Sequence, residues 1–168
     1  GDAVGSQHCR LTLGGRTWKV LVPGRDHQVA ETSNLAVLPE VRLSRSRLHL
    51  RVSPDEERVR MEVHLDTGVR KLRRRSHGYL LVTLARLRLE DRAAGIAPED
   101  AGWVQTDRLL SMLKINRSAL NTLVYRAREQ FSGIGLPDGA DIVQRRPPMD
   151  LIRLGVEDVV VETAEVPR

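Results

Sequence analysis

Cysteine is nearly absent from this chain, since Cys9 is the only one in 168 residues. A single thiol can form neither an internal disulfide nor a cysteine cage for a metal ion, so neither is expected to stabilise the fold. Cys9 lies in a run that predicts a strand, where we expect it to act as a small, buried or half-buried apolar side chain.

Long apolar runs are also missing. Arg or Glu interrupts the longest apolar stretches, and the first residues lack the charged-then-apolar order of a signal peptide. We therefore expect a cytoplasmic protein that does not bind a membrane. The 40% hydrophobic content is sufficient for one globular domain, or for two small ones that share an interface.

Signatures of catalysis are absent as well. No glycine-rich phosphate loop follows a predicted strand, and no nucleophile motif is present. Neighbouring acids such as Glu99 and Asp100 stand in turn-like contexts, where a solvated loop explains them. The histidines are scattered without metal-ligand spacing: His8, His27, His49, His64 and His77. The sequence therefore predicts a protein that is not an enzyme, with no metal site and no cofactor.

The clearest local signals lie between residues 103 and 156. Thr106 is a suitable N-cap for a short helix with one apolar face, and polar capping residues precede a second helix at about 117–131. The apolar residues of this second helix keep helical spacing: Leu120, Leu123, Val124, Ala127 and Phe131. Both segments are therefore predicted to be amphipathic helices.

A basic β-hairpin is predicted next, with strands at 142–146 and 150–154 and with Pro147-Pro148 at its tip. Two short helices followed by a hairpin is the order of a winged helix, in which the hairpin is the wing.

Upstream of these elements the pattern predicts a helix at about 78–94 and a β-hairpin within 58–72. A further hairpin is predicted at Cys9–Leu13 and Thr17–Val22. The expected fold class is α+β, with a β-rich N-terminal half followed by a winged helix-turn-helix of three helices. The expected divisions are a β-rich region at 1–57, a winged-helix domain at 58–156 that includes its N-terminal hairpin, and a C-terminal tail at 157–168.

Several of these segments resemble the OmpR-like winged-helix output domain of bacterial response regulators. The matching pieces are Gly102-Trp103-Val104, the helix around 119–128 and the hairpin at 143–154. Residues 76–81 and 125–131 resemble more closely the segment that follows forkhead-associated domains in many bacterial proteins. The resemblance covers roughly residues 48–156, and it implies a DNA-binding signalling output module.

The helix at 117–131 would be the recognition helix of such a module. Arg and Asn can form paired hydrogen bonds with base edges in a major groove, while Tyr and Thr reach the phosphate backbone. The predicted DNA contacts are Arg117, Asn121, Thr122, Tyr125, Arg126, Arg128, Arg145 and Arg146. The Pro147-Pro148 tip differs from the glycine-rich tip usual in DNA-binding members, and it would be stiffer in a minor groove.

A dense basic run precedes the helix at 78–94. Residues 69–92 contain eight basic and two acidic residues, although the whole chain has a net charge of only +5. Candidate contacts to phosphate or to an acidic partner are Arg70, Lys71, Arg73, Arg74 and Arg75. A strand end followed by a solvated loop explains the same residues equally well.

Two hypotheses of function remain open. The first is a bacterial transcription regulator or signalling output module that binds double-stranded DNA, as a homodimer because one helix reads few base pairs. The second is a non-enzymatic adaptor that uses the winged fold to bind a protein partner in phosphopeptide-type signalling. Ser46-Arg47-Leu48-His49 resembles the phosphothreonine signature of forkhead-associated domains, but a strand with Arg and His on its outer face is the interpretation we favour.

Overall fold

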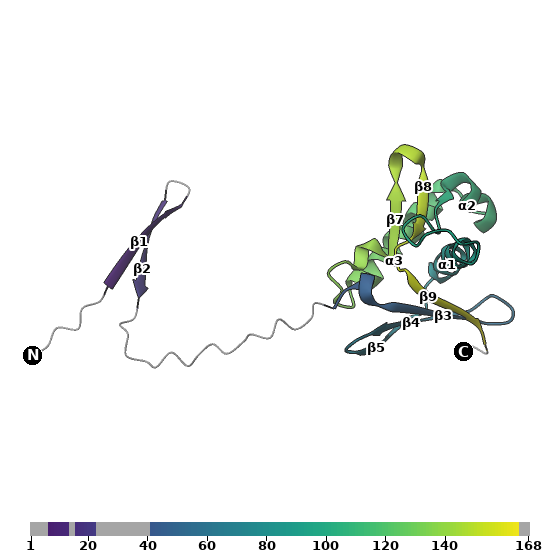
Figure 1. Cartoon of the computed structure of the whole chain (residues 1–168), viewed down its shortest axis with the longest axis horizontal. Coiled ribbons are helices and arrows are strands. Elements are labelled where there is room, and N and C mark those ends of the chain that lie inside the picture. The colour runs from purple at the N-terminus through teal and green to yellow at the C-terminus, as the bar shows by residue number, and fades with distance from the viewer. Residues whose placement is uncertain (1–6, 14–15, 23–40, 165–168) are drawn as a thin grey trace, which may run out of the picture. The chain divides into compact units, whose positions relative to one another are not determined.

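The computed structural model describes residues 7–13, 16–22 and 41–164, and it divides the chain into a unit at 1–39 and a unit at 40–168 (Figure 1). In the first unit, β1 (Gln7–Leu13) and β2 (Arg16–Val22) pair in antiparallel fashion. This pairing confirms the hairpin predicted there. The expected burial of Cys9 lies outside the side chains that the structure describes.

A four-stranded sheet in the order β5-β4-β3-β9 forms the base of the second unit. Its strands are β3 (Arg47–Val52), β4 (Val59–Leu65), β5 (Gly68–Leu72) and β9 (Asp158–Thr163). The pairs β3–β4 and β4–β5 are antiparallel, whereas β3 and β9 are parallel. Leu48, Leu50 and Val52 on β3 are fully buried, and the residues between them face the other side of the sheet. The alternation expected for the Ser46–His49 segment is thereby confirmed.

Helix α1 (Gly78–Ala93) packs on the buried face of this sheet, and Figure 1 shows the helices on one side of it. Its buried residues include Leu80, Leu81, Leu84 and Ala85, which form one broad apolar stripe. The helix predicted at about 78–94 is confirmed.

The remaining elements follow in the predicted order. Helix α2 (Thr106–Leu113) is followed by its C-cap Lys114, whose left-handed backbone (φ 53°) reverses the chain before α3 (Arg117–Ser132). Strand β6 (Val104–Gln105) joins β8 (Leu151–Leu154), and β8 pairs with β7 (Val143–Arg146) in a second sheet of order β6-β8-β7. The two helices and the β7–β8 hairpin are therefore present where they were predicted.

Three short 3-10 turns complete the unit: η1 (Leu43–Arg45), η2 (Gly139–Ile142) and η3 (Pro147–Met149). The last of these is the tip of the hairpin.

One capping prediction is wrong in detail. Gln105, not Thr106, is the N-cap of α2, and Thr106 is the first helical residue. The Thr106 hydroxyl instead donates to the carbonyl oxygen of Asp150 at 2.8 Å. For α3, Asn116 is the N-cap, and its side chain accepts from the amide of Ala119 at 2.8 Å.

The expected domain divisions also need correction. A boundary after residue 57 would separate β3 from β4, which pair along their whole length, and the compact unit begins at Glu40 instead. The expected tail contains β9, which is held in the sheet by its pairing with β3. Both errors have one cause, because strand partners distant in the sequence leave no local signal of their pairing.

The described residues form a mixed α/β structure with three α-helices, and most of the strands precede the first helix. Within this part of the chain, no helix is both long and apolar enough to cross a membrane.

Candidate nucleic-acid interface

The exposed face of α3 is the centre of the candidate site. Four residues of this helix are buried and fix its rotation on the core: Leu120, Val124, Ala127 and Phe131. The opposite face is exposed, and it presents Ser118, Asn121, Thr122, Tyr125, Arg126 and Glu129. Among the large hydrophobic residues that the structure describes, Tyr125 is the most exposed, at 62%. One solvent-exposed surface of the helix therefore carries four of the predicted DNA contacts: Asn121, Thr122, Tyr125 and Arg126.

The loop at 73–77, which carries the end of the basic run, is fastened to the C-terminal half of α3. Gln130 donates from its Nε2 to the carbonyl oxygen of Arg73 at 2.8 Å, and its Oε1 lies 2.7 Å from Nε2 of His77. Because an amide oxygen only accepts, His77 is the donor in this second bond. Arg126 adds a longer bond of 3.3 Å from its Nη1 to the hydroxyl of Ser76. We refer to the two bonds of Gln130 as the Gln130 bridge.

His77 is completely buried where this loop enters α1. Burial lowers the pKa of His77, and the positive charges of Arg75 and Arg126 lower it further. The hydrogen bond with Gln130 raises the pKa, but it offsets only part of this, so the pKa is lowered overall. The neutral imidazole is therefore the folded form, and it can donate from Nε2 as the Gln130 bridge requires.

A hollow of about 320 Å³ lies between the loop and the helix. It is lined by Arg75, Tyr125, Arg126, Glu129 and Gln130. Two guanidinium groups thus outnumber the single carboxylate of Glu129 and meet an aromatic ring at the surface. This combination suits a phosphate beside a sugar or base.

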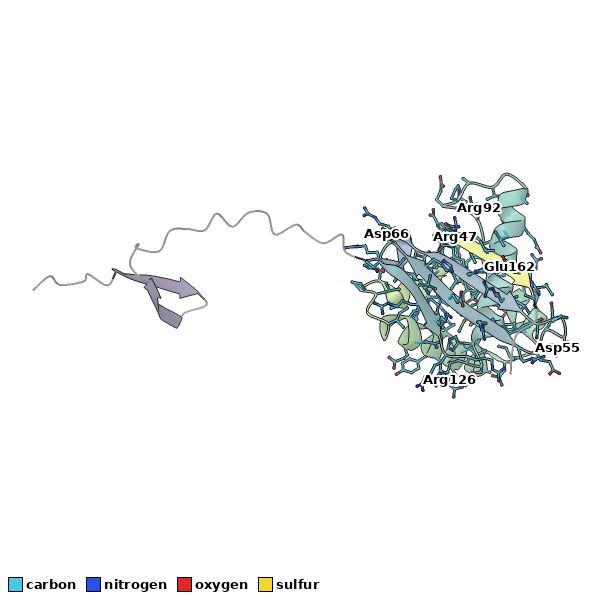
Figure 2. All side chains as sticks on the ribbon, turned by 90° about the horizontal axis from the view of Figure 1, so that it is seen from below. Arg47, Asp55, Asp66, Arg92, Arg126 and Glu162 are labelled. Carbon is cyan, nitrogen blue, oxygen red and sulfur yellow. The ribbon has the colours of Figure 1, made fainter. Side chains whose placement is uncertain are left out.

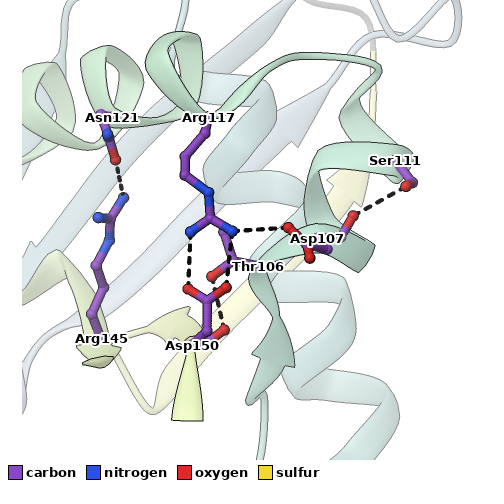
Figure 3. Close-up of polar contacts among 7 residues, drawn as sticks. All are labelled: Thr106, Asp107, Ser111, Arg117, Asn121, Arg145 and Asp150. Carbon is purple, nitrogen blue, oxygen red and sulfur yellow. Dashed lines mark hydrogen bonds and ion pairs between the residues drawn. The ribbon is translucent and has the colours of Figure 1, made fainter. Parts of the chain in front are cut away.

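The hairpin meets the N-terminal half of α3. Arg145 on β7 donates from Nη2 to Oδ1 of Asn121 at 2.9 Å, as Figure 3 shows. Burial lowers the pKa of Arg145, and the nearby charges of Arg128 and Arg117 lower it further. Arg128 donates to the carbonyl oxygen of Val143 at 2.8 Å, so its guanidinium joins helix to strand.

Arg117 has a structural role that the sequence did not indicate. Its guanidinium lies 2.9 Å from a carboxylate oxygen of Asp107 and 2.9 Å from one of Asp150 (Figure 3). The hydrogen bond and charge of Asp150, followed by those of Asp107, raise the pKa of Arg117, while the Arg117 bond holds the pKa of Asp150 below its usual range. Arg117 therefore links the start of α3 to α2 and to the hairpin, and its charge is balanced within the protein.

Arg146 lies against Trp103, with its guanidinium carbon 4.2 Å from the ring centroid, and Arg153 lies 4.3 Å from the same centroid. Arg153 also donates to Gln144 at 2.7 Å. The two cation–π contacts fix the hairpin on the segment before α2. Arg146 is exposed in spite of this contact.

The basic run does not form a single patch. Arg70 pairs in register with Val63, and Lys71 pairs with Glu62, so their side chains point to opposite faces of the sheet. The structure brings the backbone around Arg73 and the side chain of Arg75 to α3, and it leaves Lys71 on the face away from the helices. All five predicted residues of the run, Arg70, Lys71, Arg73, Arg74 and Arg75, are exposed.

A larger hollow, of about 760 Å³, lies beside the turn between β3 and β4. Its lining mixes acids and bases: Asp55, Glu56, Glu57 and Arg58 face Arg74 and Arg75. Glu56 is paired with Arg86 at 2.8 Å, and this hydrogen bond and charge lower the pKa of Glu56. The acids make this hollow a poor phosphate site, although it is the larger of the two.

Comparisons with protein families, with curated proteins and with solved structures gave no match to this chain.

Sequence reasoning missed the residues that join the loop to α3, namely Ser76, His77 and Gln130. A signal was nevertheless present, because the two segments that most closely resembled a bacterial family, 76–81 and 125–131, contain all three of them.

Proposed function

We propose that this chain is a bacterial winged-helix module that binds double-stranded DNA as a transcription regulator or signalling output domain. In this proposal α3 is the recognition helix, and the β7–β8 hairpin is the wing. The arrangement of α2, a tight turn and α3, followed by a hairpin whose sheet also includes β6, supports this assignment.

The observation that supports DNA binding most directly is the exposed face of α3. Asn121, Thr122, Tyr125 and Arg126 project from it, and the Gln130 bridge fastens a loop with three arginines beside its C-terminal half. In a major groove this face would contact base edges, while the loop would lie along a phosphate backbone. Affinity would then depend strongly on salt, as expected for an interface that neutralises phosphates.

Two of the predicted contacts are paired within the protein. Arg117 is balanced by two carboxylates, and Arg128 is bonded to a backbone carbonyl, so we assign both to positioning the helix. Phosphate contacts of the wing would come from Arg145 and Arg146, which are exposed. A single module of this kind reads few base pairs, so specific binding would require a homodimer on two half-sites.

A protein-binding adaptor is the second candidate. The hairpin tip favours it, because η3 presents Met149 with 58% of its surface exposed next to two prolines. A stiff tip with an exposed apolar side chain suits a protein surface better than a minor groove.

Fluorescence anisotropy of a random-sequence DNA duplex over a salt series tests the two candidates. The variant Arg75→Ala/Arg126→Ala removes two charges at the hollow beside α3, and Arg60→Ala/Lys71→Ala removes the same charge from the outer face of the sheet. Loss of two phosphate contacts should flatten the slope of log affinity against log salt by about 1.8 in the first variant. The second variant should keep the slope of the unmodified protein.

Two results would count against DNA binding. Absence of binding at low salt, or equal losses in both variants, would leave the charge of α3 without a specific role. Either result would favour the adaptor, and a pull-down of protein partners with a Met149→Ser control would then be the next experiment.

A further inference from the structure

The outer face of the four-stranded sheet has a cluster that the DNA-binding proposal does not use. Figure 2 views the molecule from this side and labels Arg47 and Glu162. His49 on β3 is in register with Glu62 on β4, and His64 follows Glu62 by two residues on the same face. The sequence predicted no metal site, because these histidines are far apart along the chain. Strand pairing brings them together.

The three side chains converge on one point. One ligand atom from each of His49, Glu62 and His64 can be chosen so that all three lie within 4.8 Å of one another. The two imidazole rings are 5.7 Å apart between centroids and are tilted by 52°. Two imidazoles and a carboxylate form a donor set that binds divalent transition metals.

Burial makes this cluster unusual for a solvent-facing sheet surface. Glu62 is only 7% exposed, and the Nε2 atoms of both histidines are inaccessible to solvent. Within the described part of the chain, Nε2 of His64 has no hydrogen-bond partner, whereas Nε2 of His49 lies 2.9 Å from Oε2 of Glu162. Buried polar atoms are nearly always satisfied. Nε2 of His64 lies 3.8 Å from Oε2 of Glu62, too far for a hydrogen bond, so this nitrogen beside a buried carboxylate needs a ligand to explain it.

We propose that His49, Glu62 and His64 bind one divalent transition-metal ion of the zinc class. Ligand atoms around a tetrahedral zinc ion lie about 3.3 Å apart, so small side-chain rotations would close the present arrangement onto the metal. Glu162 is half exposed at the edge of the cluster, and it supplies the fourth ligand directly or through water.

Arg51 orients the two carboxylates. Its guanidinium lies 3.9 Å from Oε1 of Glu62 and 3.6 Å from Oε2 of Glu162. The other oxygen of Glu62, Oε2, lies 3.8 Å from Nε2 of His64 and remains directed at the metal position. Such outer partners fix the ligands, as in other metal sites. The positive charge of Arg51 also lowers the affinity, so we expect weaker binding than in a cysteine-ligated structural zinc site.

Direct pairing of the two histidines with the two carboxylates is the alternative account of the same distances. That account needs no metal and predicts no stoichiometric binding.

The experiment is a titration of the full chain, stripped of metal with a chelator, with Zn²⁺ in competition with a chromophoric indicator. The unmodified protein should bind one ion per chain, and Glu62→Gln and His64→Gln should each weaken binding at least tenfold. Both changes keep the approximate shape of the side chain, and His64 is 40% exposed, so the variants should fold. Near-ultraviolet circular dichroism checks this.

A matched control removes potential metal ligands that do not belong to the proposed site. His8→Ala/Cys9→Ser eliminates a histidine and the only thiol, both outside the proposed site, and it should leave the affinity unchanged. Substitution with Co²⁺ gives a second measurement, because its visible absorption bands report nitrogen and oxygen ligation in the unmodified protein even if a variant misfolds. These bands should be present in the unmodified protein and in the control.

Several outcomes would overturn the proposal. The first is Zn²⁺ binding that survives both ligand variants. The second is binding lost only in His8→Ala/Cys9→Ser, and the third is no Zn²⁺ binding and no Co²⁺ bands in the unmodified protein. Each would show that the cluster is not the metal site.

Discussion

The Gln130 bridge gives the sharpest prediction for stability. Changing Gln130 to Ala removes the donor to the carbonyl oxygen of Arg73 and the acceptor for His77. His77 is completely buried, and its Nδ1 has no hydrogen-bond partner in the described part of the chain, so the variant leaves both ring nitrogens unsatisfied. The free energy of unfolding should therefore fall by more than a surface substitution would cost.

The magnitude follows from the two bonds. A buried donor without a partner costs about 1–3 kcal/mol, and loss of an ordinary hydrogen bond costs about 0.5–1.5 kcal/mol. We expect Gln130→Ala to lower the free energy of unfolding by about 2–4 kcal/mol, measured by urea unfolding at neutral pH.

Gln130→Glu is the matched control. The carboxylate still accepts from His77 but can no longer donate to Arg73, so this variant should lose only about 1 kcal/mol. A loss below about 0.5 kcal/mol in Gln130→Ala, or equal losses in both variants, would refute the reasoning.

Three further predictions concern stability. In Gly155→Ala, the new Cβ would lie 1.7 Å from the carbonyl oxygen of Asp141, so the backbone must shift. Urea unfolding should then show a free energy of unfolding lower by at least about 2 kcal/mol. An unchanged unfolding midpoint would contradict this contact. Because burial lowers the pKa of His77 in the folded protein, the unfolded chain binds a proton at His77 more readily. The free energy of unfolding should therefore fall as the pH drops below about 6.5, and it should fall less in His77→Gln. The same fall in both proteins would exclude His77 as its source. Burial raises the pKa of Asp138, but hydrogen bonds from the amides of Leu43 and Ser44 outweigh this effect and lower the pKa overall. The contribution of Asp138 to the free energy of unfolding should therefore be complete above about pH 3.9 and be lost below that value. Asp138→Asn should show a smaller loss than the unmodified protein over that acid range in thermal melts, and identical acid profiles would rule this contribution out.

The α-helices and the hairpin were predictable because their signals are local. Apolar residues at helical spacing indicated α1 and α3, and the Asn116 cap lies where the sequence placed polar capping residues. Alternation likewise indicated β3, with His49 on its outer face. Capping of α2 was harder, because Thr106 can bond either to its own helix or to the hairpin, and the hairpin is distant in the sequence.

The candidate site was predictable in its residue types but not in its contacts. The helical spacing of the apolar residues in α3 shows which face of the helix is exposed, and Asn121, Tyr125 and Arg126 lie on that face. The neutralisation of Arg117 was not predictable, because its partners come from α2 and from the end of the hairpin tip.

The sequence by itself determined which segments are helices and strands and which of their faces are apolar, because these properties depend on residues a few positions apart. Only the tertiary structure decided that β9 pairs with β3, that Gln130 fastens the basic loop, and that His49 meets His64. These contacts depend on the register and packing of elements far apart in the chain, which are set by burial of the shared core and not by any local pattern.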